Sequence, residues 1–478
     1  MKDTFEFTPA IKKNLFYMMG AGVLGILILL LYPHNHHARL WSNLLANTYY
    51  FTGIGIFGMF AVAAGQIAYG SWQTLEKRIF LSLSAFARIG GFILVGILIL
   101  GLLGVHTLYE HVSTIRQLAP VKIDSEYTTK IIYFAPAFWV GRVLVYASLW
   151  CIFSIVLNNF FARTDQTDPK VYKRAKILCA AFIVVFALTE SAVSWDMIMS
   201  LDTGWYSTLF GWYNFASYGC GAWAMTILLV IYLKSQGYLT RVNDNHVHDL
   251  GKLLFGFSIF WSYLWFDQFM LQWFANIPEE TSFWVKRFGT GYFEFTVFLT
   301  LAVNFAFPLL ILMTRGAKRN FKVVGFAAAV LILGHYVDFF NYTFVESGWN
   351  KEAVEAKKVE RLELSENAPL FAKLESKGEK HEAVAKDMVP ATLQKEVEQV
   401  GIKKVDKADT PGEIKEQNAD EDKPGMTFSG IGIGEILVFI GFLGVFLFMF
   451  FNNLAKRPII PENDPYLKEN ERLEVVYS

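Results

Sequence analysis

The chain has 478 residues, of which 54% are hydrophobic and 16% aromatic, whereas only 18% are charged. Soluble domains carry about 25% charged residues, so this composition argues against a large soluble core and favours a membrane protein. The formal net charge is zero, and nothing in it indicates a nucleic-acid partner. The three cysteines, Cys151, Cys179 and Cys220, stand singly in apolar runs without metal or haem spacing, so we expect them to pack as small apolar side chains.

About ten apolar runs are long enough to cross a hydrocarbon layer of roughly 30 Å as helices. The predicted spans, in chain order, are 14–32, 42–70, 85–107, 132–158, 174–199, 207–234, 251–275, 290–314, 321–345 and 429–453. The first run is too long for the core of a signal peptide, and no small-residue cleavage site follows it, so we keep it as a span. The sequence therefore predicts an all-α integral membrane protein.

Spans 2–5 and 6–9 are predicted to form two tandem four-helix bundles, flanked by spans 1 and 10. A short internal likeness supports this pairing: FWVGRVLVY at 138–146 and FWVKRFGTGY at 283–292 each follow the third helix of a unit. The predicted regions are 1–41 (N-terminus and first span), 42–158 with 174–199 (first bundle), 207–345 (second bundle), 346–428 (charged insert) and 429–478 (last span and tail).

Lysine and arginine concentrate in the short loops on one side of the predicted membrane. The loops after spans 2, 4, 6 and 8 are rich in them, whereas the loops after spans 1, 3, 5 and 7 hold far fewer. By the positive-inside rule, both termini are expected to be cytoplasmic and the 346–428 insert external. The insert is rich in Lys and Glu, which is typical of a solvated arm, either helical or flexible; a docking surface for a partner is the alternative.

Ionisable side chains inside the predicted spans gather at one depth, in the half nearer the external face. Such residues are costly in lipid and usually face a bundle interior or a water path. Each one alone has a structural explanation, for example an Arg142–Glu190 ion pair between neighbouring helices. A whole layer indicates a polar pocket or a proton path open to the outside. Its members are His106, Arg142, Glu190, Asp196, Asp267, Glu294, His335 and Asp338.

The segment from Thr189 to Phe215 places three tryptophans near two of these acids. One interpretation of the tryptophans is an aromatic belt at the membrane interface. The alternative is a flat aromatic slot that binds a quinone head group, with the carboxylates accepting its protons. Haem b is disfavoured, because only His106 and His335 lie at or within spans. The run HVHDLGK at 246–252 is interpreted as a loop, so no metal site is predicted.

Two stretches, SWDMIMSLDTGWYSTLFGWYNF (194–215) and HDLGKLLFGFSIFWSYLWFDQFMLQWFANIPEET (248–281), resemble the polysulfide-reductase, or NrfD-like, family of membrane subunits. They are most similar to the two such subunits of bacterial alternative complex III, a quinol:cytochrome c oxidoreductase. The resemblance covers about 10–345 and the last span, and the charged insert favours the second of the two, quinone-binding subunit 2.

The resemblance implies a multi-pass protein of the bacterial inner membrane, with the insert in the periplasm. It implies three kinds of partner: a sister ten-span subunit, an iron–sulfur protein and multihaem cytochrome c subunits. This chain would bind quinol but hold no haem, iron–sulfur cluster or metal. Membrane lipid surrounds it.

The family's quinol pocket lies near the external face of the first bundle. By position this implies a quinone-binding set of His106, Arg142, Glu190, Trp195 and Asp196, with Glu190 and Asp196 as the catalytic proton acceptors. If the sister subunit holds the working quinol site, this chain serves in assembly or in a proton path through Asp267, Glu294, His335 and Asp338.

Two other classes of function remain open. Paired helical units with buried carboxylates also fit a secondary transporter or proton channel, although no span is expected to be broken near its middle. A purely structural anchor subunit is the third class.

Overall fold

The computed structural model describes residues 4–31, 38–109, 132–164, 166–202, 205–288, 291–344 and 431–472. Within these ranges the regular structure is helical, and nine helices are long and apolar enough to cross a membrane. The prediction of an all-α membrane protein is therefore confirmed. Of the ten predicted spans, the seventh, 251–275, forms part of the helix Asp244–Ala275, which is not among these nine. The predicted insert 346–428 lies outside the described residues.

The helices of the first half are α1 (Pro9–Leu30), α2 (Ala38–Ile67), α3 (Lys77–Leu83), α4 (Ala87–Leu102), α7 (Pro136–Arg163), α8 (Pro169–Met197) and the 3-10 turn η2 (Met199–Leu201). The second half contains α9 (Leu209–Ser235), α10 (Asp244–Ala275), α11 (Pro278–Phe288), α12 (Gly291–Leu301), the π turn η3 (Ala302–Ala306), α13 (Phe307–Leu312), α14 (Arg315–Arg319) and the helix Phe321–Phe344. The last helices are α17 (Ile433–Leu454) and α18 (Leu467–Glu471).

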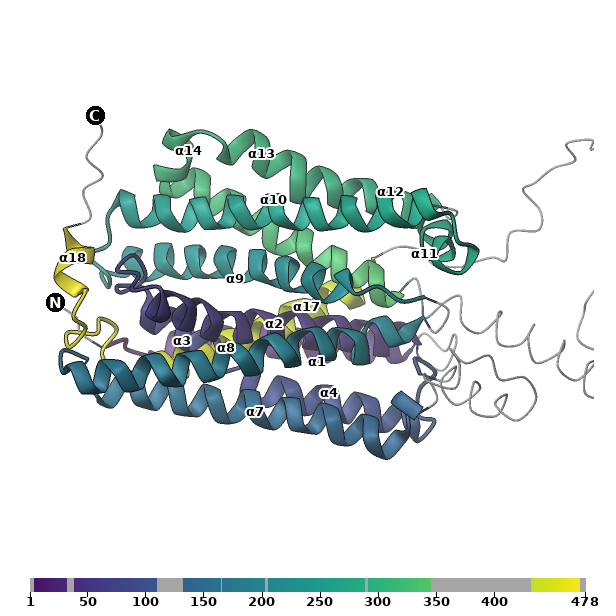
Figure 1. Cartoon of the computed structure of the whole chain (residues 1–478), viewed down its shortest axis with the longest axis horizontal. Coiled ribbons are helices and arrows are strands. Elements are labelled where there is room, and N and C mark those ends of the chain that lie inside the picture. Colours follow the sequence, from purple (N-terminus) through teal and green to yellow (C-terminus); the bar gives the residue numbers. More distant parts are fainter. Residues whose placement is uncertain are drawn as a thin grey trace, which may run out of the picture. The chain divides into compact units, whose positions relative to one another are not determined.

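The helices pack side by side in two groups joined through α2, α8 and α9. In the first group α2, α4, α7 and α8 contact one another, and in the second α10 contacts α9, η3 and α13. The N-terminus, α14 and α18 lie at one end, on the left of Figure 1, and α11 lies at the other end. We call the first the basic end, because it carries Lys77, Arg163, Lys318 and Arg457, and the second the α11 end.

The first and last spans pack together, because glycines let their backbones approach closely. A Cβ atom added to Gly22 of α1 would lie 2.5 Å from the Cα atom of Gly441 on α17, and one added to Gly25 would lie 2.7 Å from the carbonyl oxygen of Gly434. In lipid, close packing of this kind replaces the hydrophobic effect as the force between helices. The α1–α17 pair then contacts the bundles through α2 and α3.

Gly22→Ala is expected to lower the thermal stability of the purified protein, because overpacking at a close contact costs about 1–3 kcal/mol. Gly20→Ala on the same helix is the matched control, since a Cβ atom there has nothing within 4 Å. Thermal unfolding in detergent measures both variants. Equal midpoints for the two would contradict the close contact between α1 and α17.

The eighth predicted span, 290–314, is not one continuous α-helix. Its α-helical part ends at Leu301, a π turn covers Ala302–Ala306, and Pro308 stands in the first turn of α13. Proline lacks an N–H group, and π turns often mark functional positions in helices. The π turn widens the helix without breaking it, and Glu294–Leu312 is still one candidate span, so the expectation that Gly or Pro breaks no span near its middle is not contradicted. Asn304 in this turn is fully buried, and neither atom of its amide group has a hydrogen-bond partner among the described residues.

Candidate functional site

The first acid cluster lies at the α11 end of the first bundle, where α7 begins and α8 ends. Arg142 and Asp196 form a bidentate ion pair, with Nε 2.8 Å from Oδ2 and Nη2 2.6 Å from Oδ1. The Asp196 side chain is fully buried, and that of Arg142 is 11% exposed. The partner of Arg142 is therefore Asp196, so the alternative of an Arg142–Glu190 pair is wrong. Position 196 follows position 190 by about 240° of rotation around a helix, and it is Asp196 that lies within reach of Arg142 on α7.

Several other contacts fix this ion pair in place. Arg142 also donates to the carbonyl oxygen of Tyr133 at 3.2 Å, and its guanidinium lies 3.8 Å from the centre of the Tyr133 ring. Such cation–π contacts stabilise a cation away from water. Trp139 Nε1 and Ser200 Oγ both donate to the backbone carbonyl of Asp196, at 3.2 and 2.6 Å. The arrangement clamps the start of α7 to the end of α8.

His106 lies in the turn that follows α4, and its side chain is buried, with 1% of the residue exposed. The Leu108 N–H donates to Nδ1 at 3.3 Å, so Nε2 carries the proton and donates to the Ile97 carbonyl at 2.9 Å. Burial lowers the pKa of His106, which keeps the ring neutral at pH 7. Because both ring nitrogens are occupied, a quinol would have to displace one of these bonds. Quinone binding by His106 stays a prediction.

Glu190 lies deeper in α8 and has free hydrogen-bonding capacity. Its side chain is buried; Oε2 accepts from Ser191 Oγ at 3.1 Å, whereas Oε1 has no hydrogen-bond partner among the described residues. Together with Tyr49, Trp150 and Tyr218, Glu190 lines a cavity of about 10 Å³, roughly the space that one water molecule needs. A buried carboxylate with an unused acceptor beside such a space is suited to proton exchange.

The three tryptophans do not form an empty slot. Trp205 stacks on Phe283 with ring centres 4.0 Å apart, so one of its faces is already covered. Trp212 is 56% exposed, which fits an interfacial belt. Trp195 is half-buried, and its Nε1 has no hydrogen-bond partner in the described part of the chain. Of the three, Trp195 alone combines partial exposure with a buried, unused donor.

The second acid cluster is in the second bundle, and Asp338 is its centre. Tyr213 Oη donates to the carboxylate at 2.7 Å, Trp261 Nε1 at 3.1 Å and Ser217 Oγ at 3.3 Å. His335 lies one turn earlier, with Nδ1 3.0 Å from Ser217 Oγ and with Nε2 unpartnered among the described residues. Three neutral donors contact this buried acid, and no described Lys or Arg forms an ion pair with it; Arg287 is its cationic electrostatic neighbour.

The predicted proton path is thus only partly assembled. The structure brings His335 and Asp338 together through Ser217. Asp267 is half-buried on α10 and Glu294 is exposed on α12, and neither contacts this cluster within the described residues. The donors Tyr213, Ser217 and Trp261 were not predicted as part of this cluster. Tyr213 and Ser217 are four residues apart and so share one face of α9, a signal that was present in the sequence.

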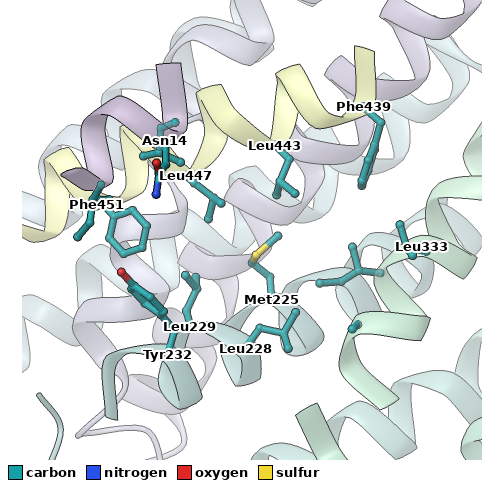
Figure 2. Close-up of a pocket in the computed structure, with 14 residues that line it drawn as sticks. Asn14, Met225, Leu228, Leu229, Tyr232, Leu333, Phe439, Leu443, Leu447 and Phe451 are labelled. Carbon is teal, nitrogen blue, oxygen red and sulfur yellow. The ribbon is translucent and has the colours of Figure 1, made fainter. Parts of the chain in front are cut away.

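A large cavity of about 490 Å³ lies away from both acid clusters, between α1, α9, α17 and the helix Phe321–Phe344. Figure 2 shows the side chains of Met225, Leu229, Leu443 and Leu447 that surround it. The polar side chains in its lining are Asn14 and Tyr232. This space can hold an apolar chain, but its lining offers no carboxylate or imidazole for proton exchange.

The helices and clusters define an all-α, multi-pass membrane protein that keeps carboxylates in its interior. Within the described residues, no group of three or more His, Cys, Asp or Glu side chains is placed to hold a metal ion. No family model matches the chain, and no curated protein matches it.

Proposed function

We propose that this chain is the membrane subunit of a quinol:cytochrome c oxidoreductase of the bacterial inner membrane, and that it conducts protons through Glu190 and Asp338. The observation that supports this most is the set of neutral donors around Asp338. An ion pair fixes the charge of a buried acid, whereas neutral donors allow it to take up and release a proton. The resemblance described above supplies the redox context.

The chemistry requires bases close to the quinol. Oxidation of a quinol releases electrons and protons, and the protons need acceptors within hydrogen-bond reach. In this proposal the electrons pass to the iron–sulfur and multihaem subunits, and a sister ten-span subunit completes the membrane part. Glu190 is the better acceptor because its Oε1 accepts no hydrogen bond from the described part of the chain. Asp196 is occupied by Arg142, so we assign it the role of a structural anion.

A channel or transporter without redox partners is the second candidate. The observation that favours it is the π turn Ala302–Ala306, which holds the amide of Asn304 without a hydrogen-bond partner among the described residues, because π turns often mark functional positions in helices. Gentle purification of the tagged chain separates the two. Co-purifying c-type haem and iron–sulfur proteins support the oxidoreductase, whereas a lone protein that moves a solute supports the transporter. Normal activity after neutralisation of every intramembrane acid would favour a structural anchor instead.

Glu190→Gln is expected to slow quinol oxidation by the assembled complex by about a hundredfold, the typical contribution of a proton-transfer group. Glutamine keeps the size of the side chain and the Ser191 contact but cannot exchange the proton. The rate of cytochrome c reduction by a water-soluble quinol measures the effect, with haem content as the check on assembly. Glu469→Gln makes the same chemical change on the exposed surface of α18 and serves as control. An unchanged rate in Glu190→Gln would remove this residue from the proton path.

A further inference from the structure

A second polar cavity, of about 130 Å³, is lined by residues of α3, α4 and α7 and of the end of α17. Four cationic side chains line it: Arg78, Arg88, Lys456 and Arg457. The rest of its lining is three asparagines and Ile155, so it contains no carboxylate. The volume is several times the space that a single water molecule needs.

Arg78 carries most of the electrostatic cost of this arrangement. Its residue is only 3% exposed, and Nε and Nη1 have no hydrogen-bond partner among the described residues. A buried cation without a counter-ion is strongly unfavourable. Glu76 is the nearest acid in the sequence, but its electrostatic neighbour is Asp249, whereas that of Arg78 is another cation, Arg457.

The other arginines are oriented by neutral groups and are not compensated by acids. Arg88 donates to Ser154 Oγ at 2.9 Å and to Asn453 Oδ1 at 3.3 Å. Arg457 donates to Asn159 Oδ1 at 3.0 Å and to the carbonyl of Asn158 at 3.3 Å. Burial and the neighbouring Arg163 also lower the pKa of Arg457. The guanidinium groups are therefore held in place around a space that lacks an anion.

The acids nearest to this cavity form ion pairs with other cations. A neighbouring cavity of about 150 Å³ also includes Arg78 and Arg457 in its lining, and two acids take part there. Asp464 is paired with Lys77, and Glu462 is paired with Arg241 at 3.1 Å. Neither acid is left to neutralise Arg78.

The side chains around this cavity indicate which kind of anion would pair with Arg78. Ile155 lines the cavity and is 43% exposed, and Ile152 and Ile89 beside it on α7 and α4 are 54% and 37% exposed. These side chains face outward from the bundle, where lipid chains lie. Planar guanidinium groups bind phosphate with two hydrogen bonds, and basic pockets between spans bind the head groups of anionic lipids.

We propose that this cavity binds the phosphate of an anionic glycerophospholipid, whose acyl chains lie on the exposed isoleucines of α4 and α7. The phosphate bridges Arg78, Arg88 and Arg457 and supplies the counter-ion that Arg78 lacks. Lipid binding at this place ties the end of α17 to α3 and α7.

The test compares the full-length protein in nanodiscs of phosphatidylcholine alone with nanodiscs that also contain phosphatidylglycerol, and counts bound phosphatidylglycerol by native mass spectrometry. Arg78→Gln is expected to weaken binding about tenfold, the effect of losing one charge-assisted hydrogen bond. Arg457→Gln, at a half-exposed position, is expected to do the same and covers the case in which Arg78→Gln does not fold. Lys170→Gln removes one charge from the exposed start of α8 at the same end and is the control.

Three results overturn the proposal. The first is equal phosphatidylglycerol binding by the wild type, Arg457→Gln and every Arg78→Gln sample that folds. The second is an equal loss in Lys170→Gln, which would show that only the general surface charge matters. The third is full thermal stabilisation of the phosphatidylcholine sample by inorganic phosphate alone, which would make this a site for a soluble anion and not for a lipid.

Discussion

Asp338→Asn is expected to reduce quinol oxidation by the assembled complex by about a hundredfold or more, since general acid–base groups typically contribute factors of this size. Asparagine has nearly the same shape, and its single carbonyl oxygen still accepts from Tyr213 or Trp261. It cannot, however, take up a proton at neutral pH. The fold should survive, because the change breaks no ion pair and keeps an acceptor for the surrounding donors. The rate of cytochrome c reduction by a soluble quinol, normalised to haem content, is the measurement.

Asp338→Glu provides the matched comparison, because it keeps a carboxylate in the same cluster at the cost of one extra methylene in a packed site. We expect it to retain more activity than Asp338→Asn. His335→Gln tests the neighbouring position, since glutamine can accept from Ser217 but lacks the second ring nitrogen, which has no hydrogen-bond partner within the described ranges. Wild-type rates in Asp338→Asn would exclude this cluster from proton transfer.

Arg142→Met is expected to lower the free energy of unfolding by about 3–5 kcal/mol, because it leaves the charge of Asp196 buried and unpaired. For a membrane protein this predicts a large loss of folded protein in the bilayer. The double variant Arg142→Met with Asp196→Asn removes both charges and should recover most of the yield, since replacing both partners of a buried ion pair is often nearly neutral. Yield and thermal midpoint in detergent measure both.

The double variant also separates two roles of Asp196. If Asp196 only anchors Arg142, the recovered complexes oxidise quinol at a rate close to that of the wild type. Recovered but inactive complexes would show that the pair takes part in quinol oxidation beyond its structural role, in agreement with the predicted quinone-binding set. Equal stability of the single and double variants would contradict the ion pair as a clamp between α7 and α8.

The helical spans were predictable from the sequence because the length of an apolar run is set by the thickness of the bilayer. The helix ends were less predictable, because a helix continues beyond the lipid where caps support it. The seventh span was predicted from 251, yet α10 begins at Asp244, where Asn243 and His246 form a capping box. The change from polar to apolar residues near 251 therefore marks where the membrane span begins, whereas the helix itself begins at Asp244.

The position of each acid along its helix was predictable, but the partners of the acids were not. Rise along a helix fixes depth, whereas partners depend on how each helix is rotated against its neighbours. His335 and Asp338 are three residues apart and necessarily share a face. Glu190 and Asp196 do not, and the structure gives them separate surroundings. Glu294 has the expected position along its helix but is exposed, which hydropathy alone does not reveal.

The most direct test of proton transfer through the interior acids is an infrared difference spectrum of the purified complex, recorded as it oxidises quinol. We predict a change in the carbonyl absorption of protonated carboxylic acids, with one component missing in Glu190→Gln and another missing in Asp338→Asn. A wild-type spectrum without this change, or one identical in both variants, would show that neither carboxylate changes its protonation during turnover.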